Sequence, residues 1–119
     1  MNNISGTLIG GYSDNSRNLI SGNNSDGMTL YFSGSYIYNN YIGKDATGNN
    51  GIGNLSNGIN IYGSNNFIGS TDKGNIIAYN LKDGVVVNYG TGNKILGNSI
   101  FSNGEEGIDL GSNGKNPKW

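Results

Sequence analysis

Acid–base chemistry in this chain would depend on its carboxylates, because the sequence contains no His and no Cys. A glycoside hydrolase needs two carboxyl groups roughly 5 to 9.5 Å apart. The row of residues that we expect on the outer face of one set of strands contains a single carboxylate, and it consists of Thr29, Asn60, Val86 and Asp109. We therefore predict no paired carboxylates on one strand face and no enzymatic activity.

A second set of acidic and amide side chains precedes four glycines along the chain, and it consists of Asp26, Asn57, Asp83 and Glu106. Side chains of these types at turns accept hydrogen bonds from nearby backbone N–H groups. We interpret this column as a series of corner caps, with a weak cation site as the alternative. The only arginine, Arg17, lies in a different corner loop.

The segment 45–51 carries side-chain oxygen atoms at Asp45, Thr47 and Asn49. Alternating oxygen donors are typical of calcium loops, but this segment lacks the second carboxylate and the bidentate Glu of such loops. A Gly-rich turn is the favoured interpretation, and these three residues remain weak metal candidates. We predict no cofactor.

Tyrosine side chains are a stronger indication of a binding surface. Tyr36 and Tyr38 flank Ile37, which we expect to point inward, so the two rings should lie on the outer face of a strand. Together with Tyr62 they could contact a partner molecule or stack on a sugar. The alternative is that tyrosines stack on their own neighbours in adjacent coils.

Three short segments recur along the chain and must position these side chains. The first follows a Gly and reads GMTLYF, GINIY, GVVVNY and GIDL, with Gly-to-Gly spacings of 31, 26 and 23 residues. The second is Asn-x-Ile-x-x-Asn at 18–23, 75–80 and 98–103, with an Asp-ending variant at 40–45. The third carries one inward Ile and lies at 7–10, 36–39, 67–70 and 94–97. Repeats of this length predict a solenoid.

The pattern within these segments is that of strands. No window has the 3.6-residue period of a helix, and apolar residues alternate with others. In the first segment eight side chains should face inward: Met28, Ile59, Val85, Ile108, Leu30, Ile61, Val87 and Leu110. Such short strands become stable when each pairs with its equivalent one coil away, about 4.8 Å distant. We predict an all-β fold, a parallel β-helix (β-solenoid) of about four coils with three short strands each.

The corners of such a coil explain the 22 Gly and 23 Asn residues, because both types accept a positive φ at low cost. Stacked Asn amides can also bond to one another and to the backbone. We predict an Asn ladder formed by Asn23, Asn80 and Asn103. Insertions at 11–17, 43–54 and 70–74 lengthen individual corners.

Several stretches resemble a known family. NYIGKDATG at 40–48, NFIGSTDKGNIIAYN at 66–80 and TGNKILGNSI at 91–100 resemble the repeats of bacterial right-handed parallel β-helix proteins, the pectin-lyase-like β-solenoids. The resemblance covers residue 3 to about residue 111. It implies right-handed coils and an extracellular or cell-surface location. It implies little about function, because this fold serves lyases, epimerases, tailspikes and adhesins alike.

The two ends of the array suggest self-association. We expect one domain over 1–119, with a first partial coil at 1–25, coils at 26–56, 57–82 and 83–105, and a last partial coil and tail at 106–119. Uncapped solenoid ends expose unpaired strand edges. We therefore predict a non-catalytic structural module that stacks end to end on copies of itself. The residues at the joint would be Leu8, Ile9, Ile20, Ile108 and Leu110. Pro117 and the charged tail count against this hypothesis, since they could cover the last edge.

Composition excludes other partners. The formal net charge is −1, from 7 basic and 8 acidic residues without a basic patch, so nucleic acid is not an expected partner. No apolar run approaches the roughly 20 residues that span a bilayer, and the first residues lack the pattern of a signal peptide. The main alternative to a structural role is a domain that binds or processes polysaccharide.

Overall fold

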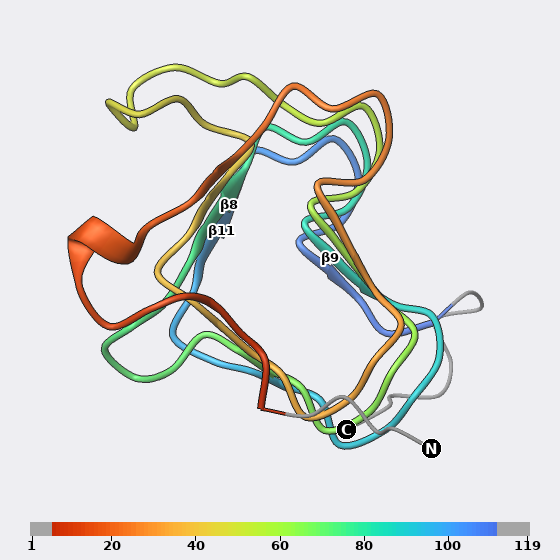
Figure 1. Cartoon of the computed structure of the whole chain (residues 1–119). Coiled ribbons are helices and arrows are strands. Elements are labelled where there is room, and N and C mark those ends of the chain that lie inside the picture. Colours follow the sequence, from red (N-terminus) through yellow and green to blue (C-terminus); the bar gives the residue numbers. More distant parts are fainter. Residues whose placement is uncertain (1–5, 112–119) are drawn as a thin grey trace.

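The computed structural model describes residues 6–111, and the tail containing Pro117 lies outside this range. Within these residues the chain forms twelve short strands in three four-stranded sheets (Figure 1). Sheet A consists of β1 (Leu8–Gly10), β4 (Tyr36–Tyr38), β7 (Phe67–Ile68) and β10 (Lys94–Ile95). Sheet B consists of β2 (Leu19–Ile20), β5 (Tyr41–Ile42), β8 (Ile76–Ala78) and β11 (Ser99–Phe101). Sheet C consists of β3 (Met28–Leu30), β6 (Ile59–Ile61), β9 (Val85–Val87) and β12 (Ile108–Asp109).

Taking one strand of each sheet as a coil, β1–β3 form the first coil, β4–β6 the second, β7–β9 the third and β10–β12 the last. All strand pairs between successive coils are parallel, and each strand pairs with its equivalent one coil on. In sheet C, for example, Met28 is aligned with Ile59, and Ile59 with Val85. The three sheets lie on different sides of the solenoid (Figure 1). The core side chains fill the space between the sheets. The predicted parallel β-helix of four coils with three strands each is thereby confirmed.

The core is a set of apolar columns, one residue per coil. Ile37 and Ile68 of sheet A, Ile42 and Ile77 of sheet B, and Val85 of sheet C are all fully buried. Along each strand alternate side chains point inward. Because equivalent strands pair in register from coil to coil, the inward side chains stack into columns. The structure therefore has the inward phase expected from the alternation in the sequence.

The outer row of sheet C differs from the expectation. Its middle members, Asn60 and Val86, face away from the apolar core but are only 8% and 6% exposed. The chain turns inward just before this sheet, so that its outer face lies on an indented side of the coil (Figure 1). Asn60 also bonds to Asp26 and Asn88, which helps to cover the row.

Three of the four corners that lead into the column Asn23, Asn54, Asn80 and Asn103 have a residue with positive φ immediately before the Asn, and Gly53 before Asn54 is the exception. Gly22 (φ 69°), Tyr79 (φ 64°) and Ser102 (φ 56°) precede Asn23, Asn80 and Asn103 in this way. This left-handed conformation turns the chain sharply and points the following side chain inward between coils. The corner therefore depends on backbone geometry first, and several residue types can occupy it.

Three insertions leave the coil at particular corners. The loop 11–17 contains a short 3-10 helix, η1 (Asp14–Ser16), and the loop 43–53 is closed by an antiparallel bridge between Lys44 and Gly51. The loop 70–74 approaches the second coil, where Asn39 N–H donates to the Lys73 carbonyl. None of the helical turns in residues 6–111 has the length and apolar character needed to cross a membrane.

Candidate functional site

The apolar columns open at both ends of the solenoid. In sheet A, Ile37 is fully buried, whereas Ile9 in the first coil and Ile95 in the last coil are partly exposed. In sheet C, Ile108 at the end of its column is 37% exposed. The end coils therefore present apolar surface that inner coils bury against a neighbour.

The residues that we expected at a joint lie at these ends, in two different orientations. Ile9, Ile20 and Leu110 pack against the core and are half-buried, and Ile108 continues the column of Val85. Leu8, in contrast, is 44% exposed and occupies the same outer row as Tyr36. Leu8 can contribute to the rim of a joint but not to its apolar centre.

The outermost strands also have unpaired edges. β1, β2 and β3 at one end, and β10, β11 and β12 at the other, each pair with one described neighbour instead of two. A hollow of about 390 Å³ lies against β10, and the described residues that line it are residues 92–96. Unpaired edges of this kind are templates for further strands.

An amide ladder runs along the start of sheet B. The side-chain Nδ2 of Asn18 donates to Asn40 Oδ1 at 3.1 Å, Asn40 to Asn75 at 3.0 Å, and Asn75 to Asn98 at 2.9 Å. Each Oδ1 also accepts the backbone N–H of the preceding Asn in the ladder. We did not predict this ladder, although the first Asn of each Asn-x-Ile-x-x-Asn segment marked its positions.

A second amide ladder runs along the end of sheet B and includes the residues that we predicted. Its order is Asn23, Asn54, Asn80 and Asn103, with Nδ2 to Oδ1 distances of 2.9, 2.8 and 3.0 Å. The expectation that the second coil ends this segment with Asp45 was wrong. The inserted loop 43–53 carries Asp45 away from the corner, and Asn54 returns to the ladder position.

A shorter ladder precedes sheet A. Asn66 Nδ2 donates to Asn93 Oδ1 at 3.0 Å, and the backbone N–H of Ser35 donates to Asn66 Oδ1. Ser35 replaces Asn in the second coil, and its buried hydroxyl has no partner within the described residues. The serine side chain is too short to continue the amide chain.

The column before sheet C bonds in the opposite direction. Here each backbone N–H donates to the side chain of the previous coil: Asn57 to Asp26, Asp83 to Asn57, and Glu106 to Asp83, at 2.9 to 3.0 Å. The column therefore acts as the corner cap that we predicted. Hydrogen bonds from Asn60, Asn57 and Ser56 outweigh the cost of burial and lower the pKa of Asp26.

Three carboxylates meet where this column reaches the last coil. One oxygen each of Asp83, Glu106 and Asp109 lies within 4.8 Å of the others. The expectation of no paired carboxylates on one strand face was therefore incomplete, because the corner column and the outer row converge. Burial raises the pKa of Asp83, and the neighbouring charges of Asp109 and Glu105 raise it further, against the hydrogen bond from Glu106 N–H.

The three carboxylates of this cluster differ in exposure: Asp83 is buried, Asp109 is half-buried and Glu106 is exposed. Asp83, the member with the raised pKa, is only 6% exposed, and its Oδ1 already accepts a backbone hydrogen bond. A general acid must reach the leaving oxygen of its substrate directly or through one water. The cluster has the oxygen donors of a cation site, but the Asp83 carboxylate also caps the corner.

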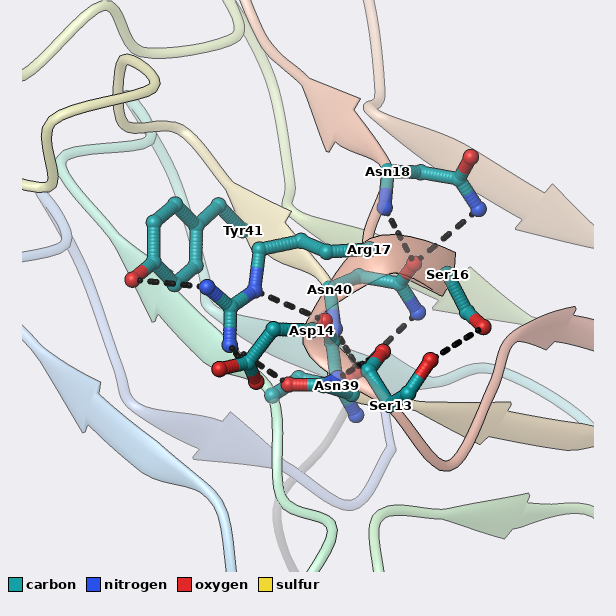
Figure 2. A network of polar contacts seen from close by, with 9 residues as sticks. Ser13, Asp14, Ser16, Arg17, Asn18, Asn39, Asn40 and Tyr41 are labelled. Atoms are coloured by element: carbon teal, nitrogen blue, oxygen red, sulfur yellow. Dashed lines mark hydrogen bonds and ion pairs between the residues drawn. The ribbon is translucent and has the colours of Figure 1, made fainter.

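Arg17 fixes the loop 11–17 against the second coil (Figure 2). Its guanidinium donates to the carbonyl and side chain of Asn39, to the Tyr41 hydroxyl and to Asp14, at 2.7 to 3.2 Å. It also stacks on the Tyr41 ring, 4.2 Å from the ring centroid. The loop therefore leans towards the second coil.

Tyr36, Tyr38 and Tyr62, the candidate binding residues, lie in two separate aromatic groups. Tyr38 was expected on an exposed face but is only 8% exposed, because Tyr12 packs on it at 5.7 Å, and Tyr36 stacks on Phe67. Tyr62 lies in an outer stack between Tyr31 and Tyr89, with centroids 5.0 and 5.8 Å apart. Tyr31 and Tyr89, at the two ends of this stack, are 74% and 67% exposed.

The Asp45 loop satisfies its own oxygen atoms. Asp45 Oδ1 accepts hydrogen bonds from Thr47 and Gly48, and Oδ2 accepts one from the Asn50 amide. The side-chain bonds from Thr47 and Asn50 lower the pKa of Asp45 to about 2. Thr47 Oγ1 in turn accepts the Asn49 backbone N–H. The three weak metal candidates thus form a self-contained turn.

The fold and its open ends define a β-solenoid built from amide-capped coils. Comparisons of the chain with protein-family models, with curated proteins and with solved structures found no match.

Proposed function

We propose that this chain is a structural β-solenoid module that extends end to end with copies of itself into a rod. The observation that carries the proposal is the opening of the core columns at both ends, where the inward-facing Ile108 is 37% exposed while Val85 in the same column is fully buried. Covering these ends would bury apolar surface and pair the free strand edges of the outer coils.

The small size of the module supports this role. Four coils span about 19 Å along the axis at about 4.8 Å per coil. Two of the four coils are end coils, so half of the array lacks one neighbour. Stability in stacked repeats rises with each added interface. A rod without catalytic function agrees with the burial of Asp83, whose carboxylate already accepts the Glu106 N–H. The family resemblance supports an extracellular or cell-surface location.

The proposal is tested with the purified chain by light scattering across concentration and by electron microscopy. We expect mass to grow with concentration, and rods with an axial repeat near 19 Å, about four coils. Ile108→Lys places a charge on the open column end and should abolish growth. Leu81→Lys is the matched control, because Leu81 is 59% exposed and its side chain belongs to no core column.

Two results would contradict the proposal. One is a monomer at every concentration, and the other is association that Ile108→Lys leaves unchanged. Circular dichroism of both variants must show wild-type folding, which is expected because a lysine at a partly exposed position can extend its charge into water.

Polysaccharide binding is the alternative function, and the tyrosine stack is the observation that favours it. Tyr31 and Tyr89 are 74% and 67% exposed and flank Tyr62 on one side of the solenoid. A glycan-binding screen of the wild type and of Tyr31→Ala tests it. Binding that is lost in the variant would favour this function over the rod.

A further inference from the structure

The two ends of the solenoid are chemically different, which limits how two copies can join. Within residues 6–111, the backbone N–H groups of Asn98 and Asn103 in the last coil have no acceptor. The equivalent N–H groups of Asn75 and Asn80 one coil earlier donate to the Oδ1 of the next Asn. Among the described residues, the last coil therefore presents donors without acceptors.

The first coil presents the matching acceptors. Within the described residues, the Oδ1 atoms of Asn18 and Asn23 accept no hydrogen bond, whereas those of Asn40 and Asn54 each accept two. In the repeat geometry, the position one coil beyond Asn98 is that of Asn18, and the position one coil beyond Asn103 is that of Asn23. Donors at one end thus meet acceptors at the other.

The column before sheet C (Asp26, Asn57, Asp83 and Glu106) also pairs a donor at one end with an acceptor at the other, but its donors lie at the opposite end from those of the amide ladders. In this column an N–H group of a later coil donates to the side chain of an earlier coil, as Glu106 N–H does to Asp83. The Glu106 carboxylate has no such donor within the described residues, and the Asp26 N–H at the other end has no such acceptor. A following copy would supply the Asp26 N–H at the position where Glu106 needs it.

We propose that the partner of each end is the opposite end of a second copy, joined head to tail in the register of the repeat. This inference rests on the proposed function and names its partner and geometry. β1 of the second copy pairs with β10, β2 with β11 and β3 with β12. The amide ladders continue across the joint from Asn98 to Asn18 and from Asn103 to Asn23. The hollow against β10 receives the β1 segment with Ile9.

The same polar groups disfavour a joint between two last coils or between two first coils. Two last coils face to face would set the carboxylates of Glu106 and Asp109 against their own copies, next to Asp83. Two first coils would set the free Oδ1 atoms of Asn18 and Asn23 against each other. Neither arrangement sets N–H donors opposite these oxygens in the register of the repeat, and unpaired polar groups at an interface cost free energy.

Disulfide trapping tests the direction and the register, because the chain contains no Cys. Ser99, Ile76, Tyr41 and Leu19 are aligned in sheet B, so Ser99 of one copy should lie beside Leu19 of the next. Parallel neighbours about 4.8 Å apart fall within the Cα separation that a disulfide accepts. Both side chains are exposed.

We expect a mixture of Ser99→Cys and Leu19→Cys to form a disulfide-linked dimer under mild oxidation, while each variant alone remains largely monomeric on a non-reducing gel. A mixture of Ser99→Cys and Leu8→Cys is the matched control, because Leu8 lies in sheet A and should not crosslink. Leu8→Cys should instead trap Lys94→Cys, its counterpart in β10.

The outcomes separate this inference from the proposed function. Crosslinking of either variant with itself, or association in light scattering without the Ser99–Leu19 crosslink, would overturn the head-to-tail register and leave the rod intact. A chain that stays monomeric in light scattering at all concentrations would overturn both.

Discussion

At the scale of residues, Asn is frequent because its amide can bond to an equivalent amide in the next coil, about 4.8 Å away. Its Nδ2 donates and its Oδ1 accepts, so a column of Asn bonds along the axis without a change of side chain. Asn80 shows the full set, since it accepts from Asn54 and donates to Asn103 and to the Ile42 carbonyl. Each ladder also satisfies backbone N–H groups that the corners remove from the sheets.

Asn80→Asp should destabilise the fold by at least about 2 kcal/mol, because it buries a charge and replaces two donors with an acceptor. Asn80 is only 1% exposed. Urea denaturation followed by circular dichroism measures the change. Asn24→Asp makes the same substitution at an exposed position and should stay within about 0.5 kcal/mol of the wild type. Similar midpoints for the two variants would refute the ladder's role.

Asp83→Asn should stabilise the protein at pH 7, because it removes a buried charge near Asp109 and Glu105 while keeping the Oδ1 acceptor for Glu106 N–H. Asn57 occupies this position one coil earlier. Since folding raises the pKa of Asp83, protonation favours the folded wild type. The advantage of the variant should therefore shrink as the pH falls through that raised pKa towards the unfolded value.

The measurement for Asp83→Asn is the unfolding free energy of both proteins at pH 7 and at pH 4. We expect a difference of roughly 0.2–1 kcal/mol at pH 7, the size of a like-charge contact between adjacent strands, and a smaller one at pH 4. A variant that is less stable than the wild type at pH 7 would mean that the carboxylate is needed as an anion.

At the scale of elements, the corners limit the chain more than the strands do. Strands of two or three residues pair through backbone groups that any sequence supplies. A corner requires a positive φ and room for the chain to pass close to the next coil. At Gly43, φ is 99° and an added Cβ would lie 1.9 Å from the Ala78 carbonyl oxygen. Only Gly fits this position without a shift of the backbone.

Gly43→Ala should therefore lower the free energy of unfolding by more than backbone strain alone would, because the added Cβ also clashes with the Ala78 carbonyl. Gly48→Ala is the matched control, because Gly48 also has a positive φ (77°) but an added Cβ would meet nothing closer than 3.7 Å. We expect roughly 1–2 kcal/mol for Gly48→Ala from the left-handed conformation. Gly43→Ala should add about 1–3 kcal/mol for the clash. Equal thermal melting temperatures for the two variants would contradict the close approach of the coils.

At the scale of the whole molecule, the core of the described residues is a short stack in which two of four coils are at an end. Burial of a new interface at each end would therefore change stability substantially. Linkage between association and folding makes the melting temperature depend on protein concentration. This dependence provides a test of the rod that requires no imaging.

We expect the melting temperature of the wild type to rise with protein concentration and that of Ile108→Lys to stay constant. Differential scanning calorimetry over a hundredfold range of concentration measures both. A constant melting temperature in the wild type would show that the ends do not associate below the transition. Leu81→Lys should follow the wild type, since its side chain lies outside the core columns.

Much of this architecture was determined by the sequence alone. The strands, their parallel pairing and the inward phase of Ile59 and Val85 follow from alternation within three residues and from the spacing of Gly and Asn. These signals are local and repeat once per coil, so one correct coil predicts the others. The second amide ladder was predictable for the same reason at Asn23, Asn80 and Asn103.

Other features depend on the tertiary structure, because residues with the same local sequence pattern occupy different positions in the folded chain. Asn54 instead of Asp45 completes a ladder, because the path of the inserted loop determines which residue returns to the corner. Tyr38 is covered because Tyr12 from another insertion packs on it. The meeting of Asp83 with Asp109 depends on how a corner column and a strand face are placed in three dimensions. Repetition along the chain determines the coil, whereas contacts between its irregular parts depend on packing that no short window of sequence contains.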